Sequence, residues 1–515
     1  MRKLAFDFTM LSPLYLTAFT IVLFFFTIYL YLKSRYRYWK IRNIPYLEPS
    51  LLLGNANDLI LGRQSILEFQ KCIYDIAKHH KLLGTFMFQK PTLYVTELNW
   101  IKLILGRDSG HFFDRGLKFD SAEEPLTRHL FHLEGEEYRS VKDKVMPAFT
   151  LNGILILFPL LLESALNLQD YFGKVAETTV DIDVKSVMSR YAAEVIGKCA
   201  FGLKKGPLTG DNEEFYKMSK KIFLPRLRTI VKLILPNLPS FVTELFDIKM
   251  ISTEISEYFS AIIRKEIEYR RQNNKRPSDF LSYMIDVQDK DKEDCLDAQP
   301  LTDDIVAAHC FMLFIAAYEN TTVVLCAALF ELSRHPEVQE RLYQEIRDTC
   351  YTNGTFDLTM TKISKMTYLH MVVCETLRLY PPATAMIREC TEDYQIPGTD
   401  FHIDKGIQLV IPFAAMHSDP RYYTPANSFD PENFNEQAIQ SRSRYAFIPF
   451  GDGPRACVGR KLGMIQMKVG LVALAFKYQF FPSPKMKLPI TFEKRTFIMS
   501  IEGGSWVRCK TRCHD

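Results

Sequence analysis

Several patterns that would identify common classes of protein are missing from this sequence of 515 residues. Its 11 cysteines include no C-x-x-C pair and no zinc-ligand spacing, and its 11 histidines include no H-E-x-x-H, so the sequence does not indicate a zinc site. The odd number and wide spread of the cysteines are typical of a chain kept in a reducing compartment, not of a disulfide framework. Internal repeats and low-complexity tracts are also missing.

A strong excess of one charge is missing too. Lys and Arg total 64 against 60 Asp and Glu, and the net charge of +4 gives no support to nucleic-acid binding. The apolar fraction of 47% is ordinary for a globular protein, so the chain can bury a large core.

The segment from Phe8 to Leu32 contains no charged residue. As a helix, Leu11 to Leu32 would measure about 33 Å, enough to cross a hydrocarbon core of roughly 30 Å. A cleaved signal peptide would be shorter and would end in a small-residue cleavage site, and a buried core helix is rarely apolar over so long a run. Basic residues follow the segment, so the positive-inside rule predicts a cytoplasmic location for the rest of the chain; they are Lys33, Arg35, Arg37, Lys40 and Arg42.

These observations predict three regions. Residues 1–32 form a signal anchor or transmembrane helix, residues 33–50 form a basic, proline-containing linker, and residues 51–515 form the catalytic domain. Pro45 and Pro49 break regular structure in the linker.

A glycine-rich turn, Phe450 to Gly459, places one cysteine, Cys457, just ahead of an apolar segment. We expect Tyr445 to Phe450 to be extended and Lys461 to Tyr478 to be a long helix. The helix dipole and the turn amides would then favour the thiolate of Cys457. The alternative is a small buried hydrophobic side chain in a loop.

The same turn, from Gly451 to Ala456, also fits a dinucleotide-binding fingerprint. That motif requires an acidic residue about 20 positions further on to bind the ribose. The sequence has no Asp or Glu between Asp452 and Glu493, which argues against a dinucleotide site.

A second long element is predicted from Thr302 to about Arg334. Thr302 can cap its N-terminus, and His335-Pro336 marks its end. The segment is apolar on nearly all sides, so the helix should be buried. Glu319 in its middle is costly to bury unless it is paired or handles protons; the alternative is a glutamate on the one wet edge of the helix.

Most of the remaining sequence is typical of helices, which predicts a mainly α fold with a small β region. Glu375 and Arg378 lie three residues apart on one predicted helix, where they can pair. Short strands are predicted at three places: Phe86 to Thr96, Ala383 to Cys390 and Gln408 to Phe413. The charged stretch Asp286 to Asp297 is predicted to be a solvated loop, and Pro431 to Phe434 an irregular segment.

Together these segments resemble the cytochrome P-450 family of haem-thiolate enzymes over essentially the whole chain. The resemblance rests first on the haem loop F-x-x-G-x-R-x-C-x-G, whose positions are Phe450, Gly453, Arg455, Cys457 and Gly459. Glu375 and Arg378 match the E-x-x-R pair, about 80 residues before the cysteine. The anchor and the proline-containing linker are similar to the microsomal class, and the chain is most similar to insect detoxification-type members.

The resemblance implies a haem held between the long central helix and the cysteine loop. Cys457 would be the axial iron ligand. The haem-contacting residues implied around it are Arg455 and Arg388 on the propionates, Phe450 and Gly451 beside the sulfur, and Tyr138 and Lys142 on a nearby helix. Glu319, Asn320 and Thr321 are the implied catalytic residues on the oxygen-binding side, with Glu319 relaying protons.

The sequence departs from the family pattern in three motifs. Asn320 stands where the family usually has a threonine, and Thr321, one residue later, is turned by about 100° around the helix. An amide can donate a hydrogen bond to bound oxygen, but it cannot shuttle a proton as a hydroxyl does. Tyr138 and Lys142 replace a tryptophan and an arginine, and Asn433 replaces the arginine that usually joins the Glu–Arg pair.

The function implied is that of a monooxygenase of the endoplasmic reticulum membrane, with its catalytic domain on the cytoplasmic face. It would insert one atom of O2 into a lipophilic xenobiotic, hormone or fatty acid, with electrons from NADPH through a reductase and with cytochrome b5 as a further partner. Basic residues around the cysteine loop could dock the reductase or form a merely solvated face; they are Arg442, Arg444, Arg460 and Lys461.

Two alternatives remain open from the sequence. Asn320 would also fit a reductase-independent isomerase or dehydratase, and the three departures together would fit a haem-binding membrane protein without catalysis. The implied substrate-lining segments are largely apolar, which favours a lipophilic ligand; they are His111 to Phe131, Phe223 to Leu245, Phe311 to Ala316, Ala383 to Met386 and Phe497 to Ile501.

Overall fold

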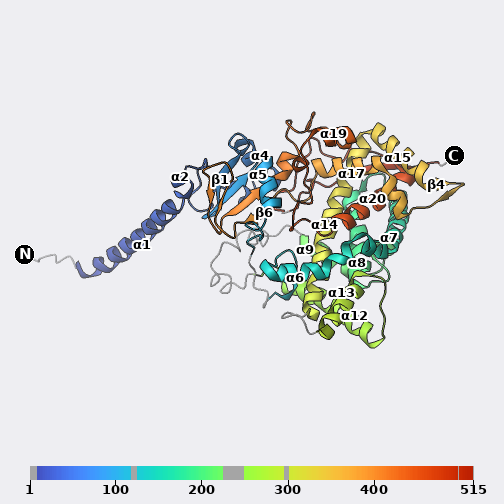
Figure 1. Cartoon of the computed structure of the whole chain (residues 1–515), viewed down its shortest axis with the longest axis horizontal. Helices are drawn as coiled ribbons and strands as arrows, with labels where there is room; N and C mark the ends of the chain where they lie inside the picture. Colours follow the sequence, from blue (N-terminus) through green and yellow to red (C-terminus); the bar gives the residue numbers. More distant parts are fainter. Residues whose placement is uncertain (1–7, 118–123, 224–248, 295–300, 497, 514–515) are drawn as a thin grey trace, which may run out of the picture.

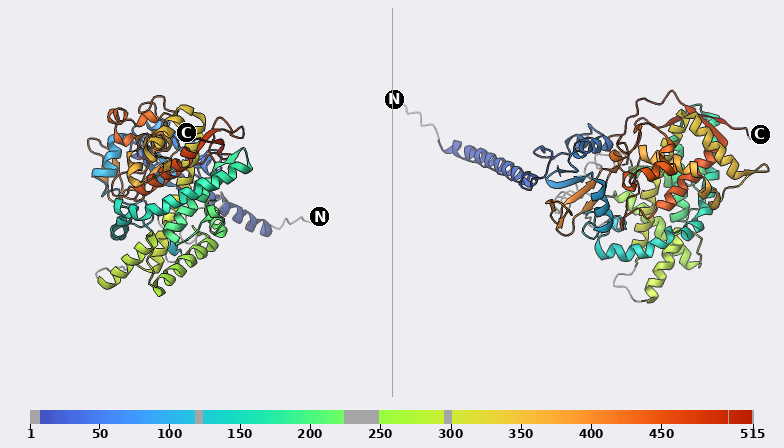
Figure 2. Two further views of the ribbon diagram at one scale, coloured as in Figure 1. Left: turned by 90° about the vertical axis from the view of Figure 1, so that its right-hand side faces the viewer. Right: turned by 45° about the horizontal axis from the view of Figure 1, so that its top comes forward.

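The computed structural model describes residues 8–117, 124–223, 249–294, 301–496 and 498–513. A long helix, α1 (Phe8–Arg35), projects from a body in which a small sheet lies on the side of α1 and most helices lie on the far side (Figure 1). The two further views show the same separation of α1 from the body (Figure 2). The mainly α fold with a small β region is confirmed.

The helices α2 to α9 run as follows: α2 (Tyr38–Ile41), α3 (Asn57–Ile60), α4 (Ile66–Ala77), α5 (Leu98–Lys102), α6 (Gly135–Val145), α7 (Leu151–Thr178), α8 (Val184–Phe201) and α9 (Glu213–Phe223). Those from α12 on are α12 (Thr253–Gln272), α13 (Phe280–Asp294), α14 (Asp303–Arg334), α15 (Pro336–Cys350), α16 (Met360–Lys365), α17 (Thr367–Leu379), α18 (Phe413–Met416), α19 (Glu436–Ser441) and α20 (Arg460–Lys477).

One sheet of four strands accounts for the predicted strands. It contains β1 (Leu82–Met87), β2 (Lys90–Val95), β6 (Met386–Glu389) and β9 (Gln408–Ile411), in the order β1-β2-β9-β6. β2 pairs in parallel with β9, and the other two pairings are antiparallel. The strands are confirmed at all three predicted places. The remaining strands are short: β3 (Ile182–Asp183), β4 (Tyr351–Thr352), β5 (Thr355–Phe356), β7 (Tyr394–Gln395), β8 (His402–Ile403), β10 (Tyr478–Pro482) and β11 (Trp506–Thr511).

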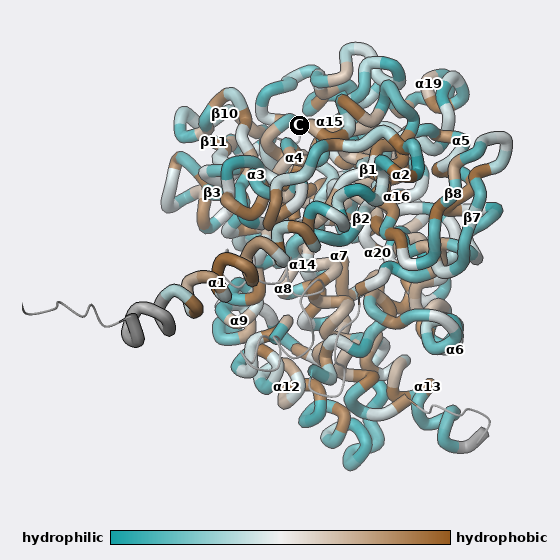
Figure 3. Tube along the Cα trace, turned by 90° about the vertical axis from the view of Figure 1, so that its left-hand side faces the viewer, coloured by the Kyte–Doolittle hydropathy of each residue, from teal (hydrophilic) through white to brown (hydrophobic). Residues whose placement is uncertain are grey.

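The first helix has the length and composition of a membrane span over Tyr15–Arg35. Its described side chains are mostly exposed although they are apolar, and Figure 3 shows α1 in the brown of hydrophobic residues. Two other helices, α7 and α14, are also long and apolar enough to span a membrane. Both pack against other helices of the body, and α14 is buried along nearly its whole length.

The segment predicted to be a linker packs onto the sheet. Tyr36, Trp39 and Ile44 are buried, and the indole Nε1 of Trp39 donates to the carbonyl of Thr85 at 2.9 Å. The Trp39 ring lies so close to Gly84 that a Cβ at position 84 would overlap it. Part of the segment 33–50 is therefore packed against the sheet at the point where α1 leaves the body.

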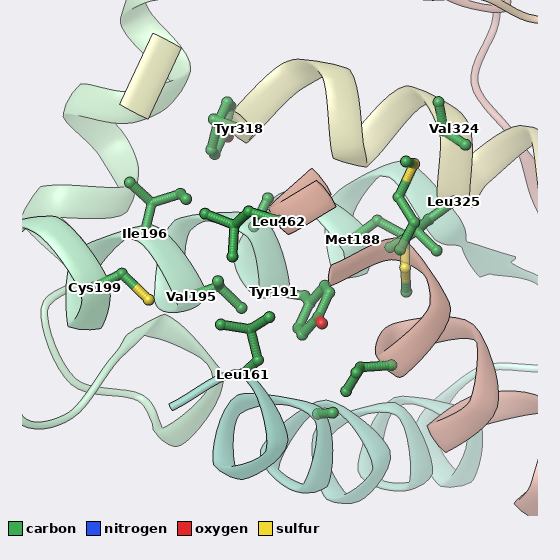
Figure 4. Close-up of a cluster of buried hydrophobic side chains, with 14 of the residues drawn as sticks. Leu161, Met188, Tyr191, Val195, Ile196, Cys199, Tyr318, Val324, Leu325 and Leu462 are labelled. Atoms are coloured by element: carbon green, nitrogen blue, oxygen red, sulfur yellow. The ribbon is translucent and has the colours of Figure 1, made fainter. Parts of the chain in front are cut away.

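The long central helix is confirmed as α14. Thr302 caps it, because its hydroxyl oxygen accepts from the backbone N–H of Ile305 at 3.3 Å. α14 packs against α8 and α20, and side chains of α7, α8, α14 and α20 meet in one apolar cluster (Figure 4). In this cluster the hydroxyl of Tyr191 donates to the backbone carbonyl of Gln466 at 3.0 Å, which ties α8 to α20.

Two predictions of local structure were wrong. The stretch Asp286 to Asp297 was predicted to be a loop, but α13 continues to Asp294. Its acidic side chains are matched by distant cations: Asp286 and Asp289 pair with Arg276, and Asp291 pairs with Lys144. Residues 295–300 lie outside the described residues.

The second wrong prediction is the extended segment from Tyr445 to Phe450. A 3-10 turn, Arg444–Ala446, begins it, because the hydroxyl of Ser443 accepts from the N–H of Tyr445. The irregular segment Pro431–Phe434 forms another short 3-10 turn, with Asp430 as its cap.

Candidate active site

The cysteine loop is closed by its own backbone. The N–H of Cys457 donates to the carbonyl of Phe450 at 2.8 Å, and that of Gly451 donates to Ile448 at 3.0 Å. Gly451 and Gly453 have φ angles of +72° and +75°, and a Cβ at Gly453 would collide with the carbonyl of Leu105. These glycines are required by the turn itself.

Cys457 is among the exposed residues of the loop. The α20 helix begins at Arg460, and the backbone N–H of Gly459 points at the sulfur, as the sequence predicted. Loss of bulk water nevertheless raises the pKa of the Cys457 thiol, against the smaller lowering effects of Gly459, Arg115 and Arg460. The Gly459 N–H acts in the direction that the sequence predicted, and the thiolate at Cys457 stays a prediction.

The α6 helix supports the loop from one side. The hydroxyl of Tyr138 and the ammonium of Lys142 both donate to the carbonyl of Pro454, at 3.0 and 2.6 Å. The guanidinium of Arg455 lies over the Tyr138 ring, 3.5 Å from its centroid. The two replaced residues thus keep contact with the haem loop through its backbone.

Arg455 is buried, and its guanidinium is engaged by the segment 113–133. It donates to the carbonyls of Phe113 at 2.9 Å and Leu133 at 2.7 Å, and it pairs with Asp114 at 3.0 Å. Burial lowers its pKa, whereas Asp114 acts in the opposite direction. In this arrangement Arg455 joins the cysteine loop to Phe113, Asp114 and Leu133, and its predicted contact with a propionate stays a prediction.

Two further arginines lie close to Arg455 and are short of acceptors. The guanidinium of Arg388 is buried and donates to the carbonyl of Ile387 at 2.9 Å. Arg115, which the sequence analysis did not identify, donates to the carbonyls of Phe131 at 2.9 Å and Arg455 at 3.4 Å. Among the described residues, neither arginine pairs with a carboxylate. No motif identifies Arg115; only its neighbours in space do.

The electrostatics of these arginines indicate an anion site. Burial, together with repulsion from Arg455, lowers the pKa of Arg388 to about 10. Burial, with repulsion from Arg388 and Arg455, lowers the pKa of Arg115 to about 9. Cations that repel one another in a desolvated place are stabilised by a ligand that brings negative charge. A haem carries two carboxylates and an iron that takes a thiolate, so the residues present fit this group.

On α14 the structure separates the three implied catalytic residues. Ala316 is exposed and Asn320 is half-buried, in a helix whose other residues are nearly all buried. The side-chain amide of Asn320 donates to the carbonyl of Ala316 at 2.6 Å. Thr321 is buried, as the rotation of about 100° per residue requires. Glu319 is buried beside them, with the ammonium of Lys185 at 3.4 Å from its Oε1.

The Glu375–Arg378 pair of α17 is completely buried. Two hydrogen bonds of 2.6 and 2.7 Å join the guanidinium to the carboxylate. The same guanidinium donates to the backbone carbonyls of His417, Ala426 and Ser428, at 2.9, 2.6 and 2.9 Å. The pair therefore fastens α17 to the irregular segment that leads to the cysteine loop.

Asn433 and Arg442 complete this pair in place of the missing arginine. The amide of Asn433 donates to Glu375 at 3.2 Å, and Arg442 donates to the carbonyl of Asn433 at 2.6 Å. The guanidiniums of Arg378 and Arg442 both lie over the ring of Tyr423, 4.7 and 4.5 Å from its centroid. The Glu–Arg pair is therefore not left with an empty position.

The implied substrate-lining segments are only partly described. Residues 118–123, 224–248 and 497 lie outside the described residues. Of the rest, Phe223, Phe314 and Tyr318 lie with their ring centroids 5.2 to 6.5 Å apart, and Tyr318 stacks on both phenylalanines. They form an apolar aromatic group on and beside α14.

A family model described as Cytochrome P450 matches residues 45–507. The chain belongs to the cytochrome P450 family. It is therefore an oxidoreductase of the monooxygenase type, and the family's cofactor is a haem whose iron is bound by a cysteine thiolate, with NADPH as the usual electron source through a reductase. No group of three or more His, Cys, Asp or Glu side chains that could hold a metal ion was found in the part of this P450 that the structure describes.

Curated relatives agree with this assignment over nearly the whole length of both chains. "Probable cytochrome P450 6a14" of Drosophila melanogaster is 33% identical and aligns over 92% of this chain and 95% of its own. "Cytochrome P450 6a9" of the same species is 31% identical over 93% and 96%. "Cytochrome P450 6j1" of Blattella germanica is 29% identical over 95% and 97%. The resemblance to insect members of the family is confirmed.

Proposed function

We propose that this P450 is a microsomal enzyme that inserts one atom of O2 into a lipophilic small molecule, with electrons from NADPH delivered by a separate reductase. The observation that carries the proposal is the complete cysteine loop beside buried arginines that match an anionic haem. When bound, the haem supplies the activation of oxygen, which a thiolate ligand favours.

The residues on the cysteine side would bind and orient the cofactor. Cys457 would ligate the iron, and the Gly459 N–H would donate to its sulfur. Arg388 and Arg115 would meet the carboxylates of the haem. Tyr138, Lys142 and Arg455 act on the loop itself, because they fix Pro454 and the segment 113–133.

The residues of α14 would act on the opposite side. Glu319 would accept and release the protons that oxygen cleavage consumes. Asn320 cannot carry a proton as a hydroxyl can, and its Nδ2 is already bound to Ala316. Its side-chain oxygen would accept a hydrogen bond from a water or a substrate at this face.

The cellular location is proposed from the length and hydropathy of α1. A described span of 21 residues, Tyr15–Arg35, with mean hydropathy 2.0, supports a membrane anchor. The basic residues after it support a cytoplasmic catalytic domain. We propose the endoplasmic reticulum membrane, where a microsomal reductase and cytochrome b5 would be reached.

The docking surface that we propose for an acidic partner has Arg460 and Lys461 as its main cations. Arg442 is engaged by Asn433, and Arg444 pairs with Asp452. Arg460 and Lys461 remain as exposed cations next to the cysteine loop. A charge reversal, Lys461→Glu, should slow reduction by the reductase, and an unchanged rate would argue against docking there.

The substrate is proposed to be a lipophilic xenobiotic, with hormones and fatty acids as the other classes to test. The aromatic group of Phe223, Phe314 and Tyr318 supports an apolar ligand. The names of the insect relatives place the chain beside other cytochromes P450 but state no substrate.

Reconstitution tests this proposal. The full chain in vesicles, with reductase and NADPH, should consume O2 and NADPH in a substrate-dependent way for part of a panel of apolar compounds. No such consumption for any compound would contradict it. Turnover of hydroperoxides to rearranged products without NADPH, in place of oxygen insertion, would favour the isomerase alternative.

A further inference from the structure

Glu319 is bound by a residue from a distant helix, and the contact lies at the edge of the body. Its Oε1 is 3.4 Å from the ammonium of Lys185, the second residue of α8. The side chain of Glu319 is 10% exposed and that of Lys185 is 40% exposed. The pair therefore connects the interior beside Asn320 with bulk water.

A hydroxyl completes this contact. The ammonium of Lys185 also donates to the Oγ of Ser500 at 2.9 Å. The loop that carries Ser500 is fixed to the start of α8, because the N–H of Val184 donates to the carbonyl of Ser505 at 2.9 Å. Lys185 is thus held between α14 and the 500–505 loop.

A small cavity lies beside Lys185 and Ser500. Its volume is about 10 Å³, about the least that a single water needs. Lys185, Thr322, Ser500 and Ser505 are among the residues that line it. A water there would have polar partners next to the ion pair.

The hydroxyls on α14 itself are placed elsewhere. Thr322 donates to the carbonyl of Tyr318 at 2.7 Å, and Thr321 is buried. Asn320 has an amide in place of a hydroxyl. Among the described residues, Ser500 is the hydroxyl that is hydrogen-bonded to the cation of the pair.

We propose that protons reach the oxygen-binding side of this P450 along the edge formed by Lys185, Ser500 and Glu319. Lys185 is the positioning residue: it holds the Glu319 carboxylate at this edge, and Ser500 fixes Lys185. In each turnover Glu319 Oε1 takes a proton from water at the edge and releases it toward the Asn320 side, so the carboxylate is regenerated and no other reactant is needed. This inference rests on the proposed monooxygenase function and deepens it.

The first test measures coupling, defined as product formed per NADPH consumed, in the reconstituted full chain. Lys185→Met should lower coupling about tenfold, below the loss of about 10²–10⁴ for removal of a proton-transferring group itself, because Glu319 remains. The lost reducing equivalents should appear as hydrogen peroxide, and the solvent isotope effect on product formation should rise. Ser500→Ala should lower coupling about twofold, since it removes one neutral hydrogen bond.

Three controls separate positioning from structure. Lys185→Arg keeps a cation and should stay within about twofold of the parent in coupling. Lys217→Met removes an exposed lysine of α9 and should leave coupling unchanged. Turnover of Lys185→Met driven by cumene hydroperoxide, which supplies the oxygen atom without added protons, should match that of the parent. Parent-like coupling and isotope effect in Lys185→Met, or equal losses in Lys185→Met and Lys185→Arg, would overturn the proposal.

A second test does not depend on turnover. Thermal unfolding of Lys185→Met, Glu319→Gln and the double variant should be non-additive, with the double variant no less stable than Lys185→Met. Additive shifts would show that the two residues do not interact and would overturn the inference. A parent that consumes no NADPH with any substrate contradicts the proposed function instead, and the unfolding cycle still decides whether the pair exists.

Discussion

Arg378 and Arg388 are both buried arginines on the cysteine side of this P450, but their surroundings differ. Arg378 has a two-bond contact with Glu375 and donates to three backbone carbonyls. Arg388 donates to one carbonyl and has Arg115 and Arg455 as its charged neighbours. The first is satisfied by the protein itself, whereas the second has no carboxylate partner among the described residues, which supports our proposal that it binds an anionic ligand.

The comparison separates a structural cation from a ligand-binding one. A buried charge is tolerated in a fold when a partner and hydrogen bonds surround it. A site that keeps a buried cation without a carboxylate is instead prepared for binding, and perturbed pKa values accompany such sites. Arg115 belongs with Arg388 in this comparison, because it too has no carboxylate partner among the described residues.

The largest expected effect on stability comes from removing the counter-charge of Arg378, which leaves it without a carboxylate partner, as Arg388 is. Glu375→Gln leaves the Arg378 guanidinium buried without its counter-charge, which should lower the free energy of unfolding by about 3–5 kcal/mol. Urea unfolding together with haem content measures this. Glu337→Gln, at an exposed position of α15, is the matched control. A Glu375→Gln chain as stable as the control would break the comparison.

Removal of Arg388 should have the opposite effects: it should weaken haem binding without lowering the stability of the haem-free chain. Arg388→Gln should leave the haem-free chain at least as stable as the parent, because the folded state disfavours this cation. The pKa of Arg388 is lowered to about 10, so its unfavourable contribution is fully present below about pH 10 and fades as the pH rises through that value. Haem affinity should fall by about 10- to 100-fold, as for a lost charge-assisted hydrogen bond.

Haem transfer to an acceptor globin and urea unfolding of the haem-free chain measure these two effects. Arg63→Gln, at an exposed arginine, should change neither. An Arg388→Gln variant that loses haem-free stability while it retains haem would reverse the roles assigned to the two arginines.

A substitution of Arg442 tests whether the hydrogen-bonded assembly around Glu375 and Arg378 extends to this residue. Arg442→Gln removes the bond to Asn433 and the contact with Tyr423, which should cost about 1–2 kcal/mol in the free energy of unfolding. Asn433→Arg in the same background should restore part of it, since it returns a cation to the family's position. If Arg442→Gln unfolds at the same urea concentration as the parent, Arg442 does not belong to the Glu375–Arg378 assembly.

The smallest expected effect lies on the opposite side, at Asn320. Asn320→Thr returns a hydroxyl next to Glu319 and should raise the coupling of NADPH use to product by about twofold. Asn320→Ala should fall slightly below the parent. A Thr variant that is no better coupled than the Ala variant would mean that a hydroxyl at this position has no part in proton delivery.

The local features of this fold could be predicted from sequence because neighbouring residues determine them. The turn that presents Cys457 requires glycines at positions 451 and 453, and Thr302 and Pro336 delimit α14. The strands followed from short apolar segments. These elements need little information from elsewhere in the chain.

The wrong predictions and the missed residues concern features that residues elsewhere in the sequence determine. α13 continues through its acidic stretch because Arg276 and Lys144 neutralise it. Arg115 and Lys185 carry no motif, and their importance comes from Arg388 and Glu319, which are far away in sequence.

The most direct test of the account is the reduced carbon monoxide difference spectrum of the full chain and of Cys457→Ala. The parent should show the Soret shift of a thiolate-ligated haem, and Cys457→Ala should lose it because no other side chain at the loop can supply the sulfur. A thiolate-type spectrum retained in Cys457→Ala, or missing from a haem-loaded parent, would contradict the assignment of Cys457 as the iron ligand.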